Sequence, residues 1–341
     1  MRWDNLRLDV RPADDRLTTP LFEQGAVVRT FDTPEFRGMT FYEVQARSII
    51  NRVPEASRMP FRFTINPYRG CTMQCRYCFA RKSHTYLDLD YGRDFDTRIV
   101  VKVNAPELLR KELAQPKWAG EHIAMGTNVD TYQRAEGRYR LMRGIIEGLC
   151  DFANPFSILT KGTLILRDLD LLVESAAVTD VAANFSVGSV DEELWRVLEP
   201  GTPSPLRRLD AVRAINDAGV PCGVLMAPIV PFLSDTDEAM RDTVRAIADA
   251  GATHIVPIVL HLRKGGSREW FMAWLNDRHS ELVPRYQELY RAGAYAPKAY
   301  QEAIAARVQG LARRFGVGRA TALEARRVAP PSPQPEQLTL S

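Results

Sequence analysis

Long apolar runs are absent from this sequence of 341 residues. A membrane-spanning helix needs about 20 consecutive apolar residues, and a secretory signal places a basic stretch before a short apolar one. Neither pattern occurs, so the sequence indicates neither membrane insertion nor secretion. We therefore expect a cytoplasmic protein with no membrane partner.

The sequence also has a small net charge and few cysteines. The formal net charge is only +3, whereas a nucleic-acid-binding domain usually has a strongly basic face or stripe. The chain has five cysteines, and three of them are clustered, which fits a metal or cofactor site in a reducing compartment better than a disulfide framework. Cys150 and Cys222 stand apart and are predicted to be buried apolar residues.

The clustered cysteines follow the spacing C-x3-C-x2-C and are Cys71, Cys75 and Cys78. Thiolates are the usual ligands of iron–sulfur clusters. Because a four-iron cluster needs one ligand per iron, three cysteines would leave one iron open to a chelating small molecule. The alternatives are a zinc site with His84 as fourth ligand, or free thiols. The spacing, the aromatic Tyr77 before the third cysteine and the strand-like run 61–65 favour the iron–sulfur cluster.

Strand-like runs alternate with helical patterns through most of the chain. The runs span residues 61–65, 122–125, 156–159, 181–185, 223–226 and 254–259. The clearest helical pattern begins with Ser204 as N-cap and Pro205 at the first position. It continues with an apolar series and stops at Gly219; the series is Leu206, Leu209, Val212 and Ile215. Six β–α units predict a parallel sheet with right-handed crossovers, and we expect an α/β fold, a partial (β/α)6 barrel.

The remaining segments are assigned around this barrel. Residues 1–37 are predicted to be an irregular lead-in, and residues 38–264 to form the barrel, with a short strand and helix at 38–59 covering one end. Within it, residues 87–97 are predicted to be a loop. We expect a helical extension over 265–318 and a disordered tail over 319–341.

Active sites of parallel barrels lie at the carboxyl ends of the strands. Besides the cysteine loop, the residues there are Gly126-Thr127-Asn128-Val129-Asp130, Thr160-Lys161, Ser186, Ala227-Pro228, His261 and Arg263. Lys161 and Ser186 would offer a cation and a hydroxyl on adjoining strands, which suits the carboxylate of a methionine moiety that chelates the open iron. Four others are either site residues or solvated loop side chains: Asp130, Tyr132, His261 and Arg263.

From about residue 38 to residue 316 the sequence resembles the radical S-adenosylmethionine (SAM) superfamily and, within it, the branch that contains spore photoproduct lyase and DNA-repair-photolyase-like proteins. The three-cysteine motif is highly specific for the superfamily, and the other phrases point to the branch less sharply. The matching phrases are Asn66-Pro67-Tyr68-Arg69-Gly70-Cys71, Tyr77-Cys78-Phe79-Ala80-Arg81, Gly126-Thr127-Asn128-Val129-Asp130-Thr131-Tyr132-Gln133, Leu159-Thr160-Lys161-Gly162, Leu198-Glu199-Pro200-Gly201, Arg207-Arg208-Leu209 and Ala227-Pro228-Ile229-Val230-Pro231.

The resemblance implies one 4Fe-4S cluster, SAM as cofactor and an external one-electron donor of the flavodoxin or ferredoxin type. Reductive cleavage of SAM would give methionine and a 5′-deoxyadenosyl radical that removes a hydrogen atom from a substrate. By position, the three cysteines would bind the cluster and Tyr77 would lie against the adenine. The backbone of Gly126, Thr127 and Asn128 would receive the methionine amine, and Lys161 and Ser186 would hold its carboxylate.

One departure concerns the hydrogen donor. Spore photoproduct lyase uses a further cysteine near the end of its second strand, whereas residues 125–129 contain none here. Neither Cys150 nor Cys222 obviously replaces it. Tyr132 or Tyr139 could donate the hydrogen atom, but packing tyrosines are the simpler prediction. The same lesion chemistry is therefore in doubt.

The leading hypothesis is a radical SAM enzyme acting on nucleic acid, as a repair or modification activity. The first alternative moves this chemistry to a protein, peptide or small molecule. The second is a non-catalytic, zinc-stabilised nucleic-acid-binding protein. A short phrase in the tail, Gln337-Leu338-Thr339-Leu340, resembles peptides that dock on bacterial sliding clamps, although the usual final aromatic residue is missing.

Overall fold

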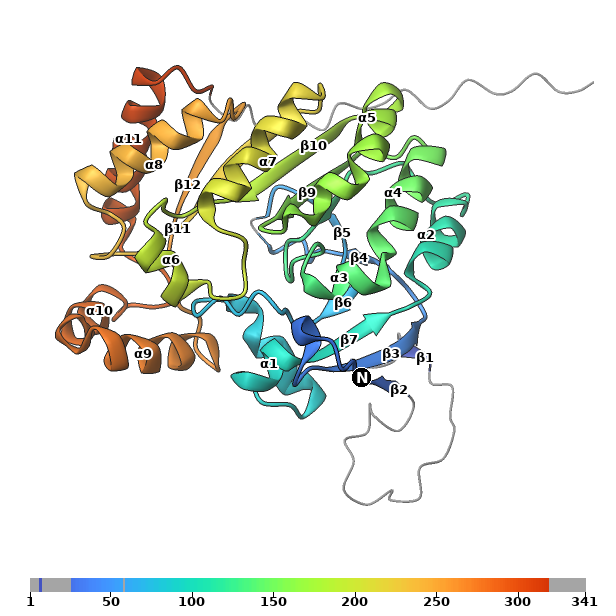
Figure 1. The fold of residues 1–341 in the computed structure, drawn as a ribbon, viewed down its shortest axis with the longest axis horizontal. Helices are drawn as coiled ribbons and strands as arrows, with labels where there is room; N and C mark the ends of the chain where they lie inside the picture. The colour runs from blue at the N-terminus through green and yellow to red at the C-terminus, as the bar shows by residue number, and fades with distance from the viewer. Residues whose placement is uncertain (1–5, 8–25, 58, 319–341) are drawn as a thin grey trace, which may run out of the picture.

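The computed structural model describes residues 6–7, 26–57 and 59–318 and has a curved parallel sheet at its centre (Figure 1). Six strands pair in chain order, each parallel to the next. They are β5 (Phe63–Ile65), β8 (Ile123–Met125), β9 (Phe156–Thr160), β10 (Val181–Ser186), β11 (Cys222–Ile229) and β12 (Ile255–Val259). One more strand, β4 (Ile50–Arg52), pairs antiparallel with β5 at the edge. The predicted α/β fold with six β–α units is confirmed.

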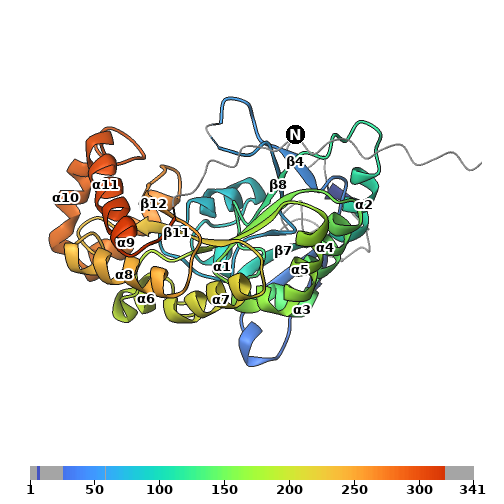
Figure 2. The ribbon, with the colours of Figure 1, turned by 90° about the horizontal axis from the view of Figure 1, so that it is seen from above.

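Helices follow the strands and cover the outside of the sheet. Figure 2 shows several of them along one side of the sheet; the crossover helices are α2 (Ala105–Leu113), α4 (Leu141–Asp151), α5 (Leu169–Val178), α7 (Pro205–Asp217) and α8 (Asp237–Asp249). Shorter elements between them are α3 (Arg134–Tyr139), η4 (Thr163–Asp168) and α6 (Glu192–Leu198). The order of strands and helices therefore follows the alternation in the sequence.

Helix α7 begins as predicted, because the Ser204 hydroxyl accepts a hydrogen bond from the Arg207 N–H group. Its core residues Leu209 and Ile215 are buried, but Leu206 is 51% exposed. The apolar prediction at Leu206 is wrong for a geometric reason. A spacing of three residues falls short of a helical turn by about 60° per step, so Leu206 and Ile215 point to opposite sides.

A second sheet lies beside the barrel. The sequence predicts two of its strands, one within 38–59 and one at 99–103, but not the pairing of these strands into a separate sheet. Its strands are β1 (Leu6–Arg7), β2 (Val27–Arg29), β3 (Thr40–Ala46), β6 (Tyr68–Arg69) and β7 (Arg98–Lys102). Residues 38–57 and 59 contain β3 and β4 and no helix, so the predicted helix there is wrong. The lead-in also has β2 and a short 3-10 helix, η2 (Pro34–Phe36). These strands are stabilised by distant partners, which local periodicity does not reveal.

The loop predicted for 87–97 is observed only over residues 88–92, and short helices lie on both sides of it. A 3-10 helix, η3 (Phe79–Leu87), precedes a short helix, α1 (Arg93–Thr97). Phe95 and Asp96 of α1 are buried. A single polar turn has too little periodicity to be recognised, and its tertiary contacts hold it in place.

The chain beyond the barrel forms α9 (Ser267–Arg278), η5 (Ser280–Leu282), α10 (Val283–Leu289) and α11 (Lys298–Arg314). Helix α11 packs on α8 and β12, whereas α9 and α10 lie together at one end of the molecule (Figure 1). None of the helices in the described ranges is both long and apolar enough to cross a membrane. The tail 319–341, with the clamp-like phrase Gln337–Leu340, lies outside the described residues.

Candidate active site at the carboxyl ends of the strands

The register of the parallel strands places their carboxyl ends at one edge. Met125 pairs with Ile65 on one side and with Ile158 on the other, and farther along Phe185 pairs with Thr160. The segments that follow these strands therefore emerge side by side: the cysteine loop 70–78, Gly126-Thr127-Asn128, Lys161 and Ser186.

Gln133 holds the beginning of the cysteine loop. Its buried side-chain oxygen accepts a hydrogen bond from the Thr72 N–H group at 2.9 Å, and its amide nitrogen donates to the Gly70 carbonyl at 3.0 Å. Both bonds flank Cys71. The segment after β8 thus determines the position of the first cysteine.

Arg81 holds the middle of the loop. Its fully buried guanidinium donates to the Cys75 carbonyl at 3.0 Å and to the two carboxylate oxygens of Asp96 at 2.9 and 3.0 Å. The guanidinium also stacks on Trp270, 4.8 Å from the ring centroid. Burial raises the pKa of Asp96 to about 6, although Arg81 opposes this shift. The pair is therefore ionised at neutral pH.

The segment after α6 forms the third contact. The Arg76 N–H group donates to the Leu198 carbonyl at 2.9 Å, and the Gly201 N–H group donates to the Met73 carbonyl at 3.2 Å. A Cβ atom at Gly201 would lie 2.4 Å from the Thr72 carbonyl oxygen, so this close approach requires glycine.

The three thiols are chemically suited to an iron–sulfur cluster. Cys71 and Cys75 are buried and Cys78 is half-buried. Burial raises the pKa of all three, that of Cys75 to about 12. A bare thiolate is thus unfavourable in this loop and needs a bound cation, which iron would supply to soft sulfur ligands.

The zinc alternative lacks its fourth ligand. The buried His84 ring has its Nε2 atom 2.9 Å from the Arg98 carbonyl oxygen and packs edge-on against Phe95. Within the described ranges, no three His, Cys, Asp or Glu side chains are grouped to hold a single metal ion. The geometry therefore does not favour a zinc site.

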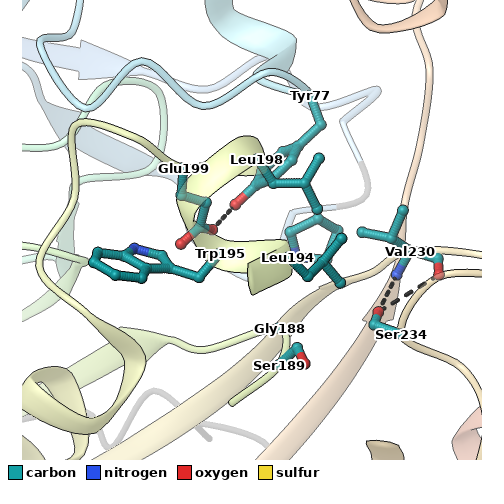
Figure 3. A pocket seen from close by; sticks show the side chains of 10 residues that line it. Tyr77, Gly188, Ser189, Leu194, Trp195, Leu198, Glu199, Val230 and Ser234 are labelled. Carbon is teal, nitrogen blue, oxygen red and sulfur yellow. Dashed lines mark hydrogen bonds between the residues drawn. The ribbon is translucent and has the colours of Figure 1, made fainter. Parts of the chain in front are cut away.

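Glu199 joins two predicted cofactor residues. The Tyr77 hydroxyl donates to one carboxylate oxygen of Glu199 (Figure 3). The Arg208 guanidinium donates to the other oxygen. The Lys161 ammonium lies 3.9 Å from the first oxygen and 5.8 Å from the centroid of the Tyr77 ring. We call Tyr77, Lys161, Glu199 and Arg208 the Glu199 cluster.

Nearby cations keep the Glu199 carboxylate ionised. Burial disfavours a charge on Glu199, but Arg208, Lys161 and the bond from Tyr77 outweigh burial and lower its pKa. Burial and the nearby Glu199 charge raise the pKa of Tyr77 well above the ordinary value. The cluster therefore combines one anion, two cations and a neutral phenol in a buried place.

Asp130 ties the end of β8 to the end of β9. Its carboxylate accepts hydrogen bonds from the Thr160 hydroxyl and the Lys161 N–H group, both at 2.6 Å. Gly126 has a φ of +76°, and a Cβ atom there would lie 1.8 Å from the Leu159 carbonyl oxygen, so only glycine fits.

The other predicted cofactor residues occupy the same edge. Thr127 and Asn128 are half-buried beside Gly126. Ser186 is buried, and its carbonyl accepts a bond from Arg208 at 2.8 Å. Its contact with the Glu199 cluster therefore runs through its backbone.

A narrow pocket opens beside this cluster. Figure 3 shows Tyr77 and Glu199 on one wall with Trp195, and Val230 and Ser234 opposite them. Its volume is about 20 Å³, roughly the space for one water molecule. We call it the inner pocket.

The family model described as "Radical SAM superfamily" matches residues 65–247, which include the cysteine loop and, in full, four of the six parallel strands. The chain belongs to the radical SAM superfamily. Membership identifies this radical SAM protein as an enzyme of a superfamily that uses a 4Fe-4S cluster and SAM.

Relatives of this radical SAM enzyme include an uncharacterized protein of Mycobacterium tuberculosis, 48% identical over 317 residues that cover 92% of this chain and 93% of the relative. A radical SAM Nalpha-GlyT isomerase of Pseudomonas phage M6 is 23% identical over 80% of this chain and 56% of that protein. A spore photoproduct lyase variant with bound AdoMet and dinucleoside spore photoproduct shares the fold, with a TM-score of 0.60, 16% identity and coverage of 78% of this chain and 77% of that one. The predicted resemblance is confirmed at the level of superfamily and fold.

The structure also places the remaining candidates of this radical SAM enzyme. Tyr132 is buried, with its hydroxyl on Asp168 at 3.1 Å, and Tyr139 donates to Glu43 at 3.1 Å. Both are packing tyrosines. His261 and Arg263 lie next to the cysteine loop. The ring of Phe79, the residue after Cys78, is 5.4 Å from the ring of His261 and 5.6 Å from the guanidinium of Arg263.

The two isolated cysteines, Cys150 and Cys222, do not lie at the carboxyl ends of the strands. Cys222 begins β11, so it lies at the amino end of that strand, and its burial raises its pKa to about 12. Cys150 lies in the last turn of α4. Neither takes the place of a thiol at the end of the second barrel strand.

Sequence reasoning missed the residues that hold the loop and the cofactor candidates in place. These are Arg81, Gln133, Glu199 and Arg208. All four occur within the phrases that resemble the superfamily, which is the only sequence signal for them. Charged and amide side chains are usually exposed to solvent, and nothing local indicated that these four would be buried.

Proposed function

We propose that this radical SAM enzyme binds one 4Fe-4S cluster through Cys71, Cys75 and Cys78, cleaves SAM reductively and removes a hydrogen atom from a nucleic-acid substrate. The observation that supports this proposal is the position of three thiols on one loop, two of them buried and one half-buried, directly beside the Glu199 cluster. All five cysteines are free thiols, which suits a reducing compartment, and we place the reaction in the cytoplasm.

When bound, the cluster supplies the electron that breaks the carbon–sulfur bond of SAM and leaves the 5′-deoxyadenosyl radical. The Lys161 ammonium would pair with the carboxylate of the methionine moiety, and the Tyr77 ring would lie against the adenine. Glu199 orients both side chains, because it accepts the Tyr77 hydrogen bond and lies 3.9 Å from Lys161.

Other residues of the edge would complete the cofactor site. The backbone of Gly126, Thr127 and Asn128 would receive the amine of the methionine moiety, and Ser186 would assist at its carboxylate. Burial of this edge would exclude water from the radical.

A nucleic-acid substrate is supported by the shared fold with a spore photoproduct lyase that binds a dinucleoside. The phage relative is named an isomerase, so the outcome of hydrogen abstraction in relatives is not confined to the lyase reaction. Residues 125–129, at the end of β8, contain no cysteine. We therefore propose DNA repair or modification in which the hydrogen atom is not returned by a thiol at the end of β8.

The test of the cofactor chemistry is anaerobic reconstitution with iron and sulfide, followed by reduction with dithionite in the presence of SAM. We expect four irons and four sulfides per chain and formation of 5′-deoxyadenosine. Cys75→Ala should lower the rate at least about 100-fold, since one iron would lose its ligand. Cys150→Ala is the matched control and should retain activity. Full iron content and cleavage in Cys75→Ala would overturn the assignment.

The substrate class is tested separately with the loaded enzyme. Duplex and single-stranded oligonucleotides, intact or ultraviolet-irradiated, should bind with an affinity that falls as salt rises, because phosphate contacts release counterions. An accepted substrate should also increase the yield of 5′-deoxyadenosine. Binding that is indifferent to salt, with no stimulation by any oligonucleotide, would contradict a nucleic-acid substrate.

A further inference from the structure

The cysteine loop has a second face that the proposed chemistry does not use. Arg76, the neighbour of Cys75, lines another pocket of about 360 Å³ between the loop, α6 and α9. We call it the outer pocket. It shares no lining residue with the inner pocket, although Arg76 adjoins Tyr77 and Val197 adjoins Leu198. The cysteine loop and the end of α6 therefore separate the two pockets.

The outer pocket is basic and aromatic. Three arginines face one carboxylate around two indole rings, and the lining residues are Arg76, Arg196, Val197, Trp270, Ala273, Trp274, Asp277 and Arg278. Two of the arginines have only exposed ion pairs, Arg196 with Glu192 at 2.8 Å and Arg278 with Asp277 at 3.2 Å. Such pairs contribute little to stability, so these arginines can exchange partners readily.

Two further observations connect the outer pocket with the cluster ligands. The buried Nε atom of Arg76 has no hydrogen-bond partner. Trp270 also stacks on the Arg81 guanidinium, which donates to the Cys75 carbonyl. The side chains of Trp270 and Arg81 thus connect the outer pocket to the backbone of Cys75, the second cysteine of the motif.

We infer that the outer pocket docks an acidic one-electron carrier protein of the flavodoxin or ferredoxin class. This inference rests on the proposed function, because only a reducible cluster needs such a partner. Each encounter transfers one electron: the carrier's reduced flavin or iron–sulfur group is oxidised by one electron, and the cluster is reduced by one. Arginines at a docking surface steer an acidic partner, and flat indole rings provide apolar contact area.

Arginine and tryptophan also suit phosphates and bases, so nucleic acid is the competing occupant. The position of the pocket argues against it. A nucleotide in the outer pocket would be separated by the cysteine loop from Tyr77 and Lys161, where the radical would form. An electron carrier, in contrast, has to approach the cysteine loop from the side opposite Tyr77 and Lys161.

The experiment uses the loaded enzyme with Arg196→Glu and Arg278→Glu combined. The matched control combines Arg213→Glu and Arg291→Glu, two exposed arginines of α7 and the segment after α10 that also form exposed ion pairs. A purified flavodoxin of net negative charge is the probe. At low salt we expect the pocket variant to raise the KM for reduced flavodoxin about tenfold or more, with no change when dithionite is the reductant. The control should match the wild type with both reductants.

Association of the same flavodoxin, measured by fluorescence anisotropy, gives a readout independent of turnover. Weaker binding in the pocket variant alone supports the inference. Equal flavodoxin binding and KM in all three proteins would overturn it, as would loss of oligonucleotide binding with flavodoxin binding retained. Failure of the wild type to cleave SAM with dithionite would instead contradict the proposed function, while the anisotropy comparison would still decide whether the carrier docks there.

Discussion

Two buried arginine–carboxylate pairs stabilise the cysteine loop from different sides, and they differ in how their carboxylates ionise. The side chains of Arg81 and Asp96 are 0% and 8% exposed, and those of Arg208 and Glu199 are 1% and 9% exposed. Burial is thus nearly equal. Yet the pKa of Asp96 is raised to about 6, whereas that of Glu199 is lowered.

The difference comes from the neighbours of each carboxylate. Asp96 has Arg81 as its direct partner, and this guanidinium also serves the carbonyls of Cys75, Tyr91 and Gly92. Glu199 has Arg208 as direct partner, Lys161 nearby and the Tyr77 hydroxyl as donor. The first pair therefore organises the backbone, and the second keeps an anion beside two proposed cofactor residues.

The largest effect should come from breaking the scaffold pair. Arg81→Met would leave the Asp96 carboxylate buried without a cation, and we expect the free energy of unfolding to fall by about 3–5 kcal/mol. Urea unfolding of the anaerobically purified protein measures this change. The double variant Arg81→Met with Asp96→Leu should recover part of the loss, because no isolated charge remains. A loss below about 1 kcal/mol in Arg81→Met would contradict the scaffold role.

The next effect, on cofactor binding, is expected at Glu199. In Glu199→Ala the Tyr77 hydroxyl loses its acceptor, and we expect the dissociation constant for SAM to rise about tenfold, equivalent to about 1.4 kcal/mol. Glu199→Gln keeps an acceptor oxygen and should fall between wild type and Glu199→Ala. Equilibrium dialysis with the reconstituted protein measures SAM binding. If Glu199→Ala bound SAM as tightly as the wild type, Glu199 would have no role in orienting the cofactor residues, and the two pairs would not differ in function.

The third effect is a change in the pH dependence of stability. Between the ordinary carboxyl pKa near 4 and the Asp96 pKa of about 6, the folded protein keeps a proton that the unfolded chain has lost. Asp96 therefore makes stability fall as pH rises through this window, by at most about 1.4 kcal/mol per pH unit. Glu199, with its lowered pKa, contributes stability that is lost only as pH falls below its ordinary range.

Unfolding curves at several pH values separate these contributions. Asp96→Asn should flatten the decline between about pH 4 and pH 6 relative to wild type. A matched exposed variant, Asp210→Asn, should leave the slope as it is. A parallel dependence in Asp96→Asn and wild type would show that Asp96 titrates in its ordinary range.

Much of the architecture could be predicted because its signals are local. The strand-like runs and the Ser204 cap are properties of neighbouring residues, and short-range periodicity reveals them. The second sheet could be predicted only in part, since β2 and β6 are strands of two or three residues, too short to show a period. Helix α1 was missed for the same reason, because it has only five residues and is held by bonds from Cys71 and Arg81, which lie outside it.

The sequence by itself determined two features of this protein: three thiols close together in one short segment, and six β–α units that bring the strand ends to one edge. Tertiary structure decided which polar residues act together. Arg81 with Asp96, Gln133 with Gly70, and Glu199 with Lys161 are 15, 63 and 38 residues apart in the sequence. No local pattern relates such residues, because burial and ionisation arise only when packing removes water and brings the charges together.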